Sequence, residues 1–135
     1  MMQLNPYLNF MGKTKEAMEF YASVFDGKLT MQTYADGGMP CKPEEAHLIM
    51  HAELRSPDIM FMAADGNSEH TVSMGDNIKM SLSGDDEEKL TRYFNALSVG
   101  GTVSQPLMKA PWGDTFGMLV DKFGVHWMVD VGMKK

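Results

Sequence analysis

The sequence is poor in cysteine, which limits how the protein can be stabilised. Among 135 residues there is one cysteine, Cys41, and it cannot form an internal disulfide. The disulfide framework of a small secreted domain is therefore excluded. A reactive thiol needs an electropositive environment that this sequence does not establish, so we do not assign Cys41 as a nucleophile.

Long apolar runs and an excess of positive charge are also missing. No apolar stretch approaches the length of a membrane span, and residues 1–6 lack the charged and apolar regions of a signal peptide. The net charge is −6, whereas nucleic acids and anionic membrane surfaces attract clustered lysine and arginine. We therefore expect a cytoplasmic protein that binds neither nucleic acid nor membrane.

What is present is typical of a globular protein. Hydrophobic residues make up 44% of the chain and charged residues 22%, and 135 residues suffice for one domain with a real core. The 15 methionines are many, and methionine serves both as an adaptable core filler and as a lining for adaptable binding surfaces. We predict a single domain, residues 1–135.

An internal repeat organises this domain. Apolar residues recur at helical spacing from about residue 13 to 26 and again 73 residues later, and a glycine follows each segment (Gly27 and Gly100). Alternating patterns predict strands at 3–11, 28–35, 47–54, 59–64, 77–84, 102–109, 114–121 and 125–131. The prediction is an α+β fold of two βαβββ repeats, about residues 1–75 and 76–135.

Local signals also predict two helix ends. Gly27 stands where a left-handed residue would end the first helix. Asp85, with Glu88 three residues later, has the pattern of a capping box that begins the second helix.

Three stretches of the chain resemble a known family. They are Pro6–Phe10 followed by Glu16–Tyr21, Met50–Leu54 running into Met60–Asp65, and Trp112–Met118 through Asp121–Trp127. Over nearly its whole length the chain resembles the PhnB-like branch of the glyoxalase/bleomycin-resistance/dioxygenase superfamily, whose members are often labelled demethylubiquinone methyltransferase-like. The resemblance implies a cupped mixed sheet built from two βαβββ repeats, and a homodimer. A glycine-rich loop that opens a helix, the usual nucleotide signal, is absent.

In this superfamily four side chains of the cup usually hold a divalent metal, and the resemblance implies the matching positions here. Three of them fall on Pro6, Lys79 and Met128, which ligate such an ion poorly or not at all. The fourth lies in the third strand, where His51 or Glu53 would fill it. We therefore expect no metal cofactor.

His51 and Glu53 are the candidate catalytic residues. They share one face of a predicted strand, and a carboxylate can orient a histidine that titrates near neutrality for acid–base chemistry. One alternative is a relocated metal site in which His126 joins them. The other is a polar pair that lines a cleft without chemistry.

Strand alternation and the resemblance together predict a mainly apolar cup for a small-molecule ligand. Besides His51 and Glu53, its expected lining is Leu8, Phe10, Lys79, Trp112, His126 and Met128. Trp127, by the same alternation, is expected to face a helix and to belong to the core.

The predicted function is that of a PhnB-like protein that binds a small molecule in this cleft, with or without lyase-like chemistry. One alternative is a metal-dependent glyoxalase- or dioxygenase-like enzyme with relocated ligands. The other is a non-catalytic protein that sequesters a small molecule, with two clefts shared between two chains. The poor ligand positions disfavour the metal-dependent alternative, whereas binder and enzyme both remain open.

Overall fold

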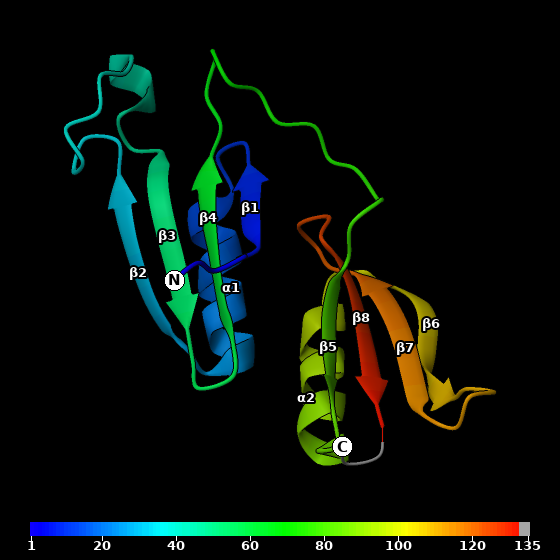
Figure 1. Ribbon diagram of the computed structural model, residues 1–135. Coiled ribbons are helices and arrows are strands. Elements are labelled where there is room, and N and C mark those ends of the chain that lie inside the picture. Colours follow the sequence, from blue (N-terminus) through cyan, green and yellow to red (C-terminus); the bar gives the residue numbers. More distant parts are fainter. Residues whose placement is uncertain (133–135) are drawn as a thin grey trace. The chain divides into compact units, whose positions relative to one another are not determined.

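The computed structural model describes residues 1–132, and the chain divides into two compact units, Met1–Ser73 and Met74–Lys135. In each unit one helix packs against one sheet (Figure 1). The first unit contains β1 (Tyr7–Phe10), α1 (Thr14–Phe25), β2 (Lys28–Thr33), the short 3-10 helix η1 (Pro43–Glu45), β3 (Ile49–Arg55) and β4 (Met60–Asp65). The second contains β5 (Met80–Gly84), α2 (Glu87–Ser98), β6 (Thr102–Lys109), β7 (Thr115–Val120) and β8 (His126–Val131).

The two sheets have the same topology. The strand order is β1-β4-β3-β2 in the first and β5-β8-β7-β6 in the second. The first strand of each unit pairs in parallel with the last, and the other neighbours are antiparallel. The two helices also begin 73 residues apart, at Thr14 and Glu87, and each has 12 residues. The predicted α+β fold of two βαβββ repeats is therefore confirmed, and the single-domain assignment stays a prediction.

The core of the first unit lies between α1 and its sheet. Tyr21 and Phe25 of α1 meet Phe61 of β4 edge-on, with ring centroids 5.6 and 6.3 Å apart. Leu54 lies opposite Phe61 in the sheet and is fully buried. Each buried aromatic side chain removes a large apolar area from water, so this cluster holds the helix on the sheet.

The second unit repeats this arrangement. The apolar stripe of α2, Leu90, Tyr93, Phe94 and Leu97, is buried against the sheet. In β8, Trp127 is 1% exposed and occupies the helix side, as the alternation predicts.

Both predicted helix caps fall one residue away from the true ones. The left-handed residue after α1 is Asp26, with φ of 50°, and not Gly27. Gly27 is required for a different reason: a Cβ at this position would lie only 2.8 Å from Cδ1 of Leu54. The N-cap of α2 is Asp86, whose carboxylate accepts the Lys89 backbone N–H at 3.1 Å, and not Asp85.

A buried aspartate in each unit organises the backbone around it. Asp65, at the end of β4, accepts the backbone N–H groups of Gly12, Thr14 and Ile49 at 2.9 to 3.1 Å. It thereby joins the start of α1 to the start of β3.

Asp121, after β7, accepts the backbone N–H groups of Phe123 and Val125 and the indole N–H of Trp127, at 2.8 to 3.1 Å. It closes the turn before β8. The two aspartates are 6% and 4% exposed, so their hydrogen bonds form away from water.

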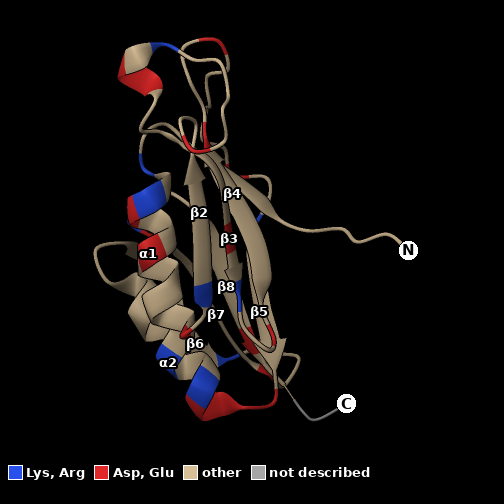
Figure 2. Ribbon diagram, turned by 90° about the vertical axis from the view of Figure 1, so that its left-hand side faces the viewer, with Lys and Arg blue, Asp and Glu red and all other residues tan. Residues whose placement is uncertain are grey.

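Charged residues of both signs lie mainly on the helices and in the loops, as Figure 2 shows. Within residues 1–132, no helix has the length and apolar character needed to span a membrane.

Candidate ligand-binding site

Each sheet has one face covered by its helix and one face that the helix does not cover, here called the helix-free face. In β7, Gly117 and Leu119 are buried on the helix side, so Phe116 and Met118 occupy the helix-free face. Met128 is the cross-strand partner of Met118 and shares that face. The helix-free face of the second unit is therefore apolar along its middle strands.

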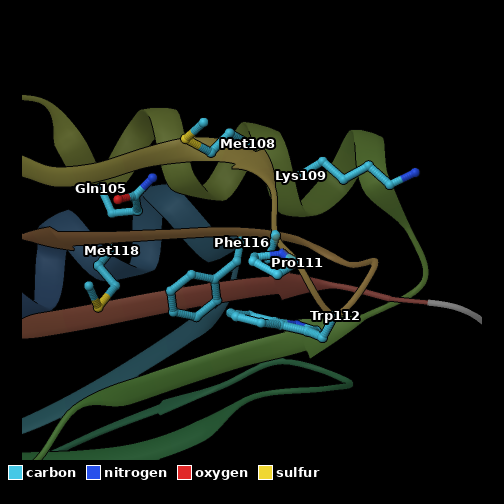
Figure 3. Close-up of a pocket in the computed structure, with 8 residues that line it drawn as sticks. Gln105, Met108, Lys109, Pro111, Trp112, Phe116 and Met118 are labelled. Atoms are coloured by element: carbon cyan, nitrogen blue, oxygen red, sulfur yellow. The ribbon is translucent and has the colours of Figure 1, made fainter.

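A hollow of about 320 Å³ opens on this face beside the β6–β7 hairpin (Figure 3). Such a volume lies at the lower end of the range of small-molecule sites, about 300 to 1,000 Å³. Its lining residues are Gln105, Met108, Lys109, Ala110, Pro111, Trp112, Phe116 and Met118.

A closed turn holds Trp112 at the end of the hollow. The Ala110 N–H donates to the Asp114 carbonyl at 2.7 Å, and the Gly113 N–H donates to the Ala110 carbonyl at 2.9 Å. Pro111 restricts the turn further, and Gly113 takes a φ of 103° that favours glycine. Trp112 is thus held by a constrained backbone although its side chain is 61% exposed.

Aromatic and thioether groups dominate the lining. The rings of Trp112 and Phe116 lie edge-on, with centroids 5.4 Å apart and planes at 67° (Figure 3). Met118 lies two residues beyond Phe116 on the same face, and Met108 is the cross-strand partner of Phe116. The site therefore offers polarizable apolar contacts and few hydrogen-bonding groups.

The helix-free face of the first unit has a different character. His51 Nδ1 and the Tyr7 hydroxyl share a hydrogen bond of 3.1 Å. Partial burial raises the pKa of the Tyr7 hydroxyl above its ordinary value, and the nearby Tyr34 adds to that increase. The neutral phenol is thus favoured beside the imidazole.

Glu53 lies two residues from His51 on the same face, as predicted, but its partner is Arg55. The Arg55 Nε and Glu53 Oε2 atoms lie 3.4 Å apart at the surface. The structure thus gives His51 and Glu53 different hydrogen-bonding partners. Neither the expected polar pair nor direct orientation of His51 by Glu53 is found.

The structure also places the other predicted site residues. Trp112 lines the hollow, and His126 and Met128 share the helix-free face of β8. Lys79 is exposed one residue before β5. The joint lining of one cup by residues of both units stays a prediction.

The expected position of Leu8 and Phe10 is wrong. Leu8 pairs with Ala63 and Phe10 with Asp65, residues that lie on the side of α1. Phe10 is 3% exposed, so it belongs to the core, and Tyr7 takes the place beside His51. The prediction placed the alternating side chains of β1 on the wrong faces of the sheet. An error of one residue in the alternation moves every side chain of a strand to the opposite face.

Alternation in β3 also changes at one point. The pairing with β2 steps from Gln32–His51 to Thr33–Ile49, which leaves Met50 as an extra residue. Ile49 is consequently buried at 4%, although strict alternation placed it with His51.

Sequence reasoning missed most of the hollow. Phe116, Met118, Met108 and Gln105 were not predicted as ligand-binding residues. The available signal was the alternation of Phe116 and Met118 with Gly117 and Leu119, next to a turn that carries tryptophan. The register of β6 against β7 could not be predicted from the sequence, because two register shifts interrupt the pairing of these strands.

No group of three or more His, Cys, Asp or Glu side chains suited to a metal ion occurs within residues 1–132. The expectation of no metal cofactor stays a prediction, since it concerns what the protein binds in solution.

The fold and the paired βαβββ units define a class of protein. A member of the glyoxalase/bleomycin-resistance/dioxygenase superfamily from Sphaerobacter thermophilus superposes with a TM-score of 0.59 at 15% identity, covering 97% of this chain and 98% of that one. The chain has the fold of that superfamily. Within it, the chain belongs to the family described as 3-demethylubiquinone-9 3-methyltransferase, which it matches over residues 2–130.

Individual relatives agree with this assignment. The protein PA1353 from Pseudomonas aeruginosa has a TM-score of 0.86 at 35% identity, covering 97% of this chain and 98% of that one. A PhnB protein from Bacillus cereus, described as a putative 3-demethylubiquinone-9 3-methyltransferase, has a TM-score of 0.79 at 28% identity, covering 97% of this chain and 100% of that one. The protein YjdN of Escherichia coli is 26% identical over 96% of this chain and 95% of its own length. The predicted PhnB-like resemblance is confirmed.

Proposed function

We propose that this protein binds a small organic molecule in the hollow beside the β6–β7 hairpin. The observation that carries the proposal is the hollow of about 320 Å³ lined by Trp112, Phe116, Met108 and Met118. A large aromatic side chain held in a constrained turn at 61% exposure loses little freedom when a ligand covers it.

A ligand screen by thermal stability tests the proposal. A molecule that binds the folded chain raises its apparent melting temperature by mass action. We expect small aromatic compounds to raise it, and Trp112→Ala to remove that increase. Val99→Ala is the matched control, because Val99 is 63% exposed in the same unit and lies outside the hollow. A stabilising ligand that is insensitive to Trp112→Ala places the binding site elsewhere.

Acid–base catalysis at His51 is the second candidate. The Tyr7–His51 hydrogen bond supports it, since a neighbour that fixes an imidazole prepares it for proton transfer. Glu53 enters this proposal as a charged neighbour on the same face. The test is to incubate the protein with a ligand found in the screen and to analyse the small molecule by mass spectrometry. Turnover that His51→Gln abolishes supports the proposal, and an unchanged ligand supports binding alone.

Metal content is proposed to be low. Proline and methionine at the implied positions 6 and 128 are poor ligands for hard or borderline divalent ions. Elemental analysis of protein purified without added metal is expected to give well under one ion per chain. About one zinc, nickel, iron or manganese per chain, lost on mutation of His51 or Glu53, supports the relocated-site alternative instead.

Assembly and location are proposed on the resemblance and on composition. A homodimer is expected, and light scattering at micromolar concentrations tests it; a monomer contradicts it. A cytoplasmic location is proposed because the single cysteine excludes the disulfide framework of a small secreted domain. The absence of nucleic acid and membrane partners is proposed from the net charge of −6. Fractionation of cells and a gel-shift assay with DNA and RNA test these two points.

A further inference from the structure

We infer that the part of the ligand held in this hollow is a planar aromatic group of about two fused rings that carries no negative charge. The inference rests on the proposed function, because it specifies the chemistry of the same site. Four properties of the hollow support it: the arrangement of its rings, its thioethers, the positions of the nearby charges, and its volume.

The rings come first. Trp112 and Phe116 lie edge-on at 5.4 Å, a geometry that aromatic groups prefer to face-to-face contact. Trp112 remains 61% exposed, so much of its surface is available to a third ring. A flat ligand beside Trp112 would extend the aromatic cluster of Trp112 and Phe116, and the turn at residues 110–114 already holds Trp112 in place.

The thioethers add a preference for aromatic partners. Met118 and Met108 lie on either side of the β6–β7 pairing, and both line the hollow. A methionine sulfur makes favourable contacts with aromatic rings and adapts its shape at little cost. A saturated ligand of equal size would gain apolar burial here but would lose the sulfur–ring and ring–ring contacts.

The charges near the hollow give an anion no partner. Lys109 contributes to the lining, and its cross-strand partner is Thr115, which lies on the opposite face of β7 from Phe116. The Lys109 ammonium points away from Trp112 in Figure 3. The Gln105 amide donates to the Pro106 carbonyl at 3.4 Å. On the helix-free face, the neighbour of Phe116 across the pairing is Asp130, which disfavours an anion. An anionic ligand group buried among the apolar residues would lack a partner and pay a desolvation penalty.

Volume limits the size of the group. About 320 Å³ admits two fused rings with a small substituent, and it is near the lower limit of small-molecule sites. The opening at the exposed Trp112 leaves room for a substituent to extend into solvent.

Three matched probes test the inference by titration calorimetry: 2-naphthylmethanol, its fully saturated decahydro analogue, and the anion 2-naphthoate. We expect the neutral aromatic alcohol to bind about three- to tenfold more tightly than the saturated alcohol, the range of an aromatic pair beyond its apolar area. We expect 2-naphthoate to bind more weakly than the alcohol. Equal binding of the aromatic and saturated alcohols, or stronger binding of 2-naphthoate, overturns the inference.

Variants locate the effect. Trp112→Phe is expected to keep the preference for the aromatic alcohol, whereas Trp112→Leu reduces it about threefold or more. Met108→Leu also reduces it, and Met39→Leu does not, because Met39 is a similarly exposed methionine in the first unit. If Met39→Leu has the same effect as Met108→Leu, the thioether part of the inference fails.

The failure of this inference and of the proposed function give different results. If both alcohols bind equally and Trp112→Ala abolishes binding of both, the proposed function stands and the aromatic specificity is wrong. If no probe binds and no compound of the wider screen depends on Trp112, both are wrong. Perturbation of the Trp112 indole signal in 15N-labelled protein, with the buried Trp127 signal as an internal reference, reads out the site directly.

Discussion

The two units share a topology and a buried face but differ on the face that the helix does not cover. Leu54 opposite Phe61 in the first unit corresponds to Leu119 opposite Trp127 in the second. On the other face, His51 and Glu53 lie three and one residues before Leu54, and they correspond to Phe116 and Met118, which lie three and one residues before Leu119. Two polar residues of one unit thus stand where the other has two residues of the hollow.

This difference shows which face of a repeated unit is constrained. Helix-facing positions such as Leu54 and Leu119 carry large apolar residues in both units because these residues exclude water from the core. The helix-free positions carry no such requirement, so one face has a hydrogen-bonded histidine and the other a ligand-sized hollow. The hairpins differ as well: residues 34–48 connect β2 to β3, whereas the short turn at 110–114 connects β6 to β7.

The largest expected effect tests what the units have in common, a buried aspartate that accepts three hydrogen bonds. Asp65→Ala and Asp121→Ala each leave three N–H donors without their acceptor. We expect each to lower the free energy of unfolding by about 3 kcal/mol, measured by urea denaturation. Asp76→Ala, at an exposed position, is the control and should change stability by less than about 0.5 kcal/mol.

A loss below about 1 kcal/mol for either aspartate would show that the backbone donors find other partners. A large loss for one variant and a small loss for the other would show that the two units are stabilised differently despite their common topology.

The second prediction breaks the apolar character of the second unit. Met118→Glu introduces the residue type of Glu53 into the hollow, where a carboxylate has no partner to offset its desolvation. We expect the affinity for 2-naphthylmethanol to fall about tenfold or more, measured by calorimetry. Met60→Glu is the matched control, since Met60 lies opposite Arg55 on the helix-free face of the first unit. Equal losses for both variants would contradict a binding site in the second unit.

The third prediction tests the polar face of the first unit. Tyr7→Phe removes the hydroxyl that bonds His51, and we expect a loss of about 0.5 to 1 kcal/mol in the free energy of unfolding at neutral pH. The pKa of Tyr7 is raised above its ordinary value of 10.0 in the folded state. The contribution of Tyr7 to the free energy of unfolding is therefore full below its ordinary pKa. This contribution is lost as the pH rises through the raised pKa of the folded state.

Urea denaturation of wild type and Tyr7→Phe at neutral and alkaline pH measures both effects. The difference between the two proteins should shrink above pH 10, where the phenol of the folded protein ionises. A difference that grows with pH would show that the phenolate, and not the phenol, is favoured beside His51.

The smallest expected effect concerns the long connection of the first unit. The backbone N–H of Thr33 donates to the Asp36 carboxylate, and this bond, with a further contribution from the Thr33 side chain, lowers the pKa of Asp36 below 3.8. The interaction stabilises the fold at pH values above the pKa that Asp36 has in the unfolded chain. This stabilisation is lost as the pH falls through the lowered pKa that Asp36 has in the folded chain. An NMR titration should show Asp36 ionising below 3.8, and Thr33→Val should move its pKa upward. An unchanged value in the variant would exclude the side-chain contribution.

The elements were more predictable than the site. The helices follow from apolar spacing, and β6 was predicted with its observed bounds, Thr102–Lys109. The site failed at Leu8 and Phe10, because a four-residue strand carries too few alternations to show which face is buried. Ile49 departs from strict alternation because a single extra residue in β3 shifts the pattern, and the cause lies in the pairing with β2.

By itself, the sequence determined the βαβββ repeat, the apolar stripes of both helices, the family, and the separation of His51 and Glu53 from the core. These depend on periods of 3.6 and 2 residues, which the backbone imposes on neighbouring positions. Only the tertiary structure decided that His51 bonds Tyr7, that Glu53 bonds Arg55, and that Trp112 meets Phe116 beside two methionines. Those contacts join different strands and turns, so they depend on strand register and bulges, which no local period encodes.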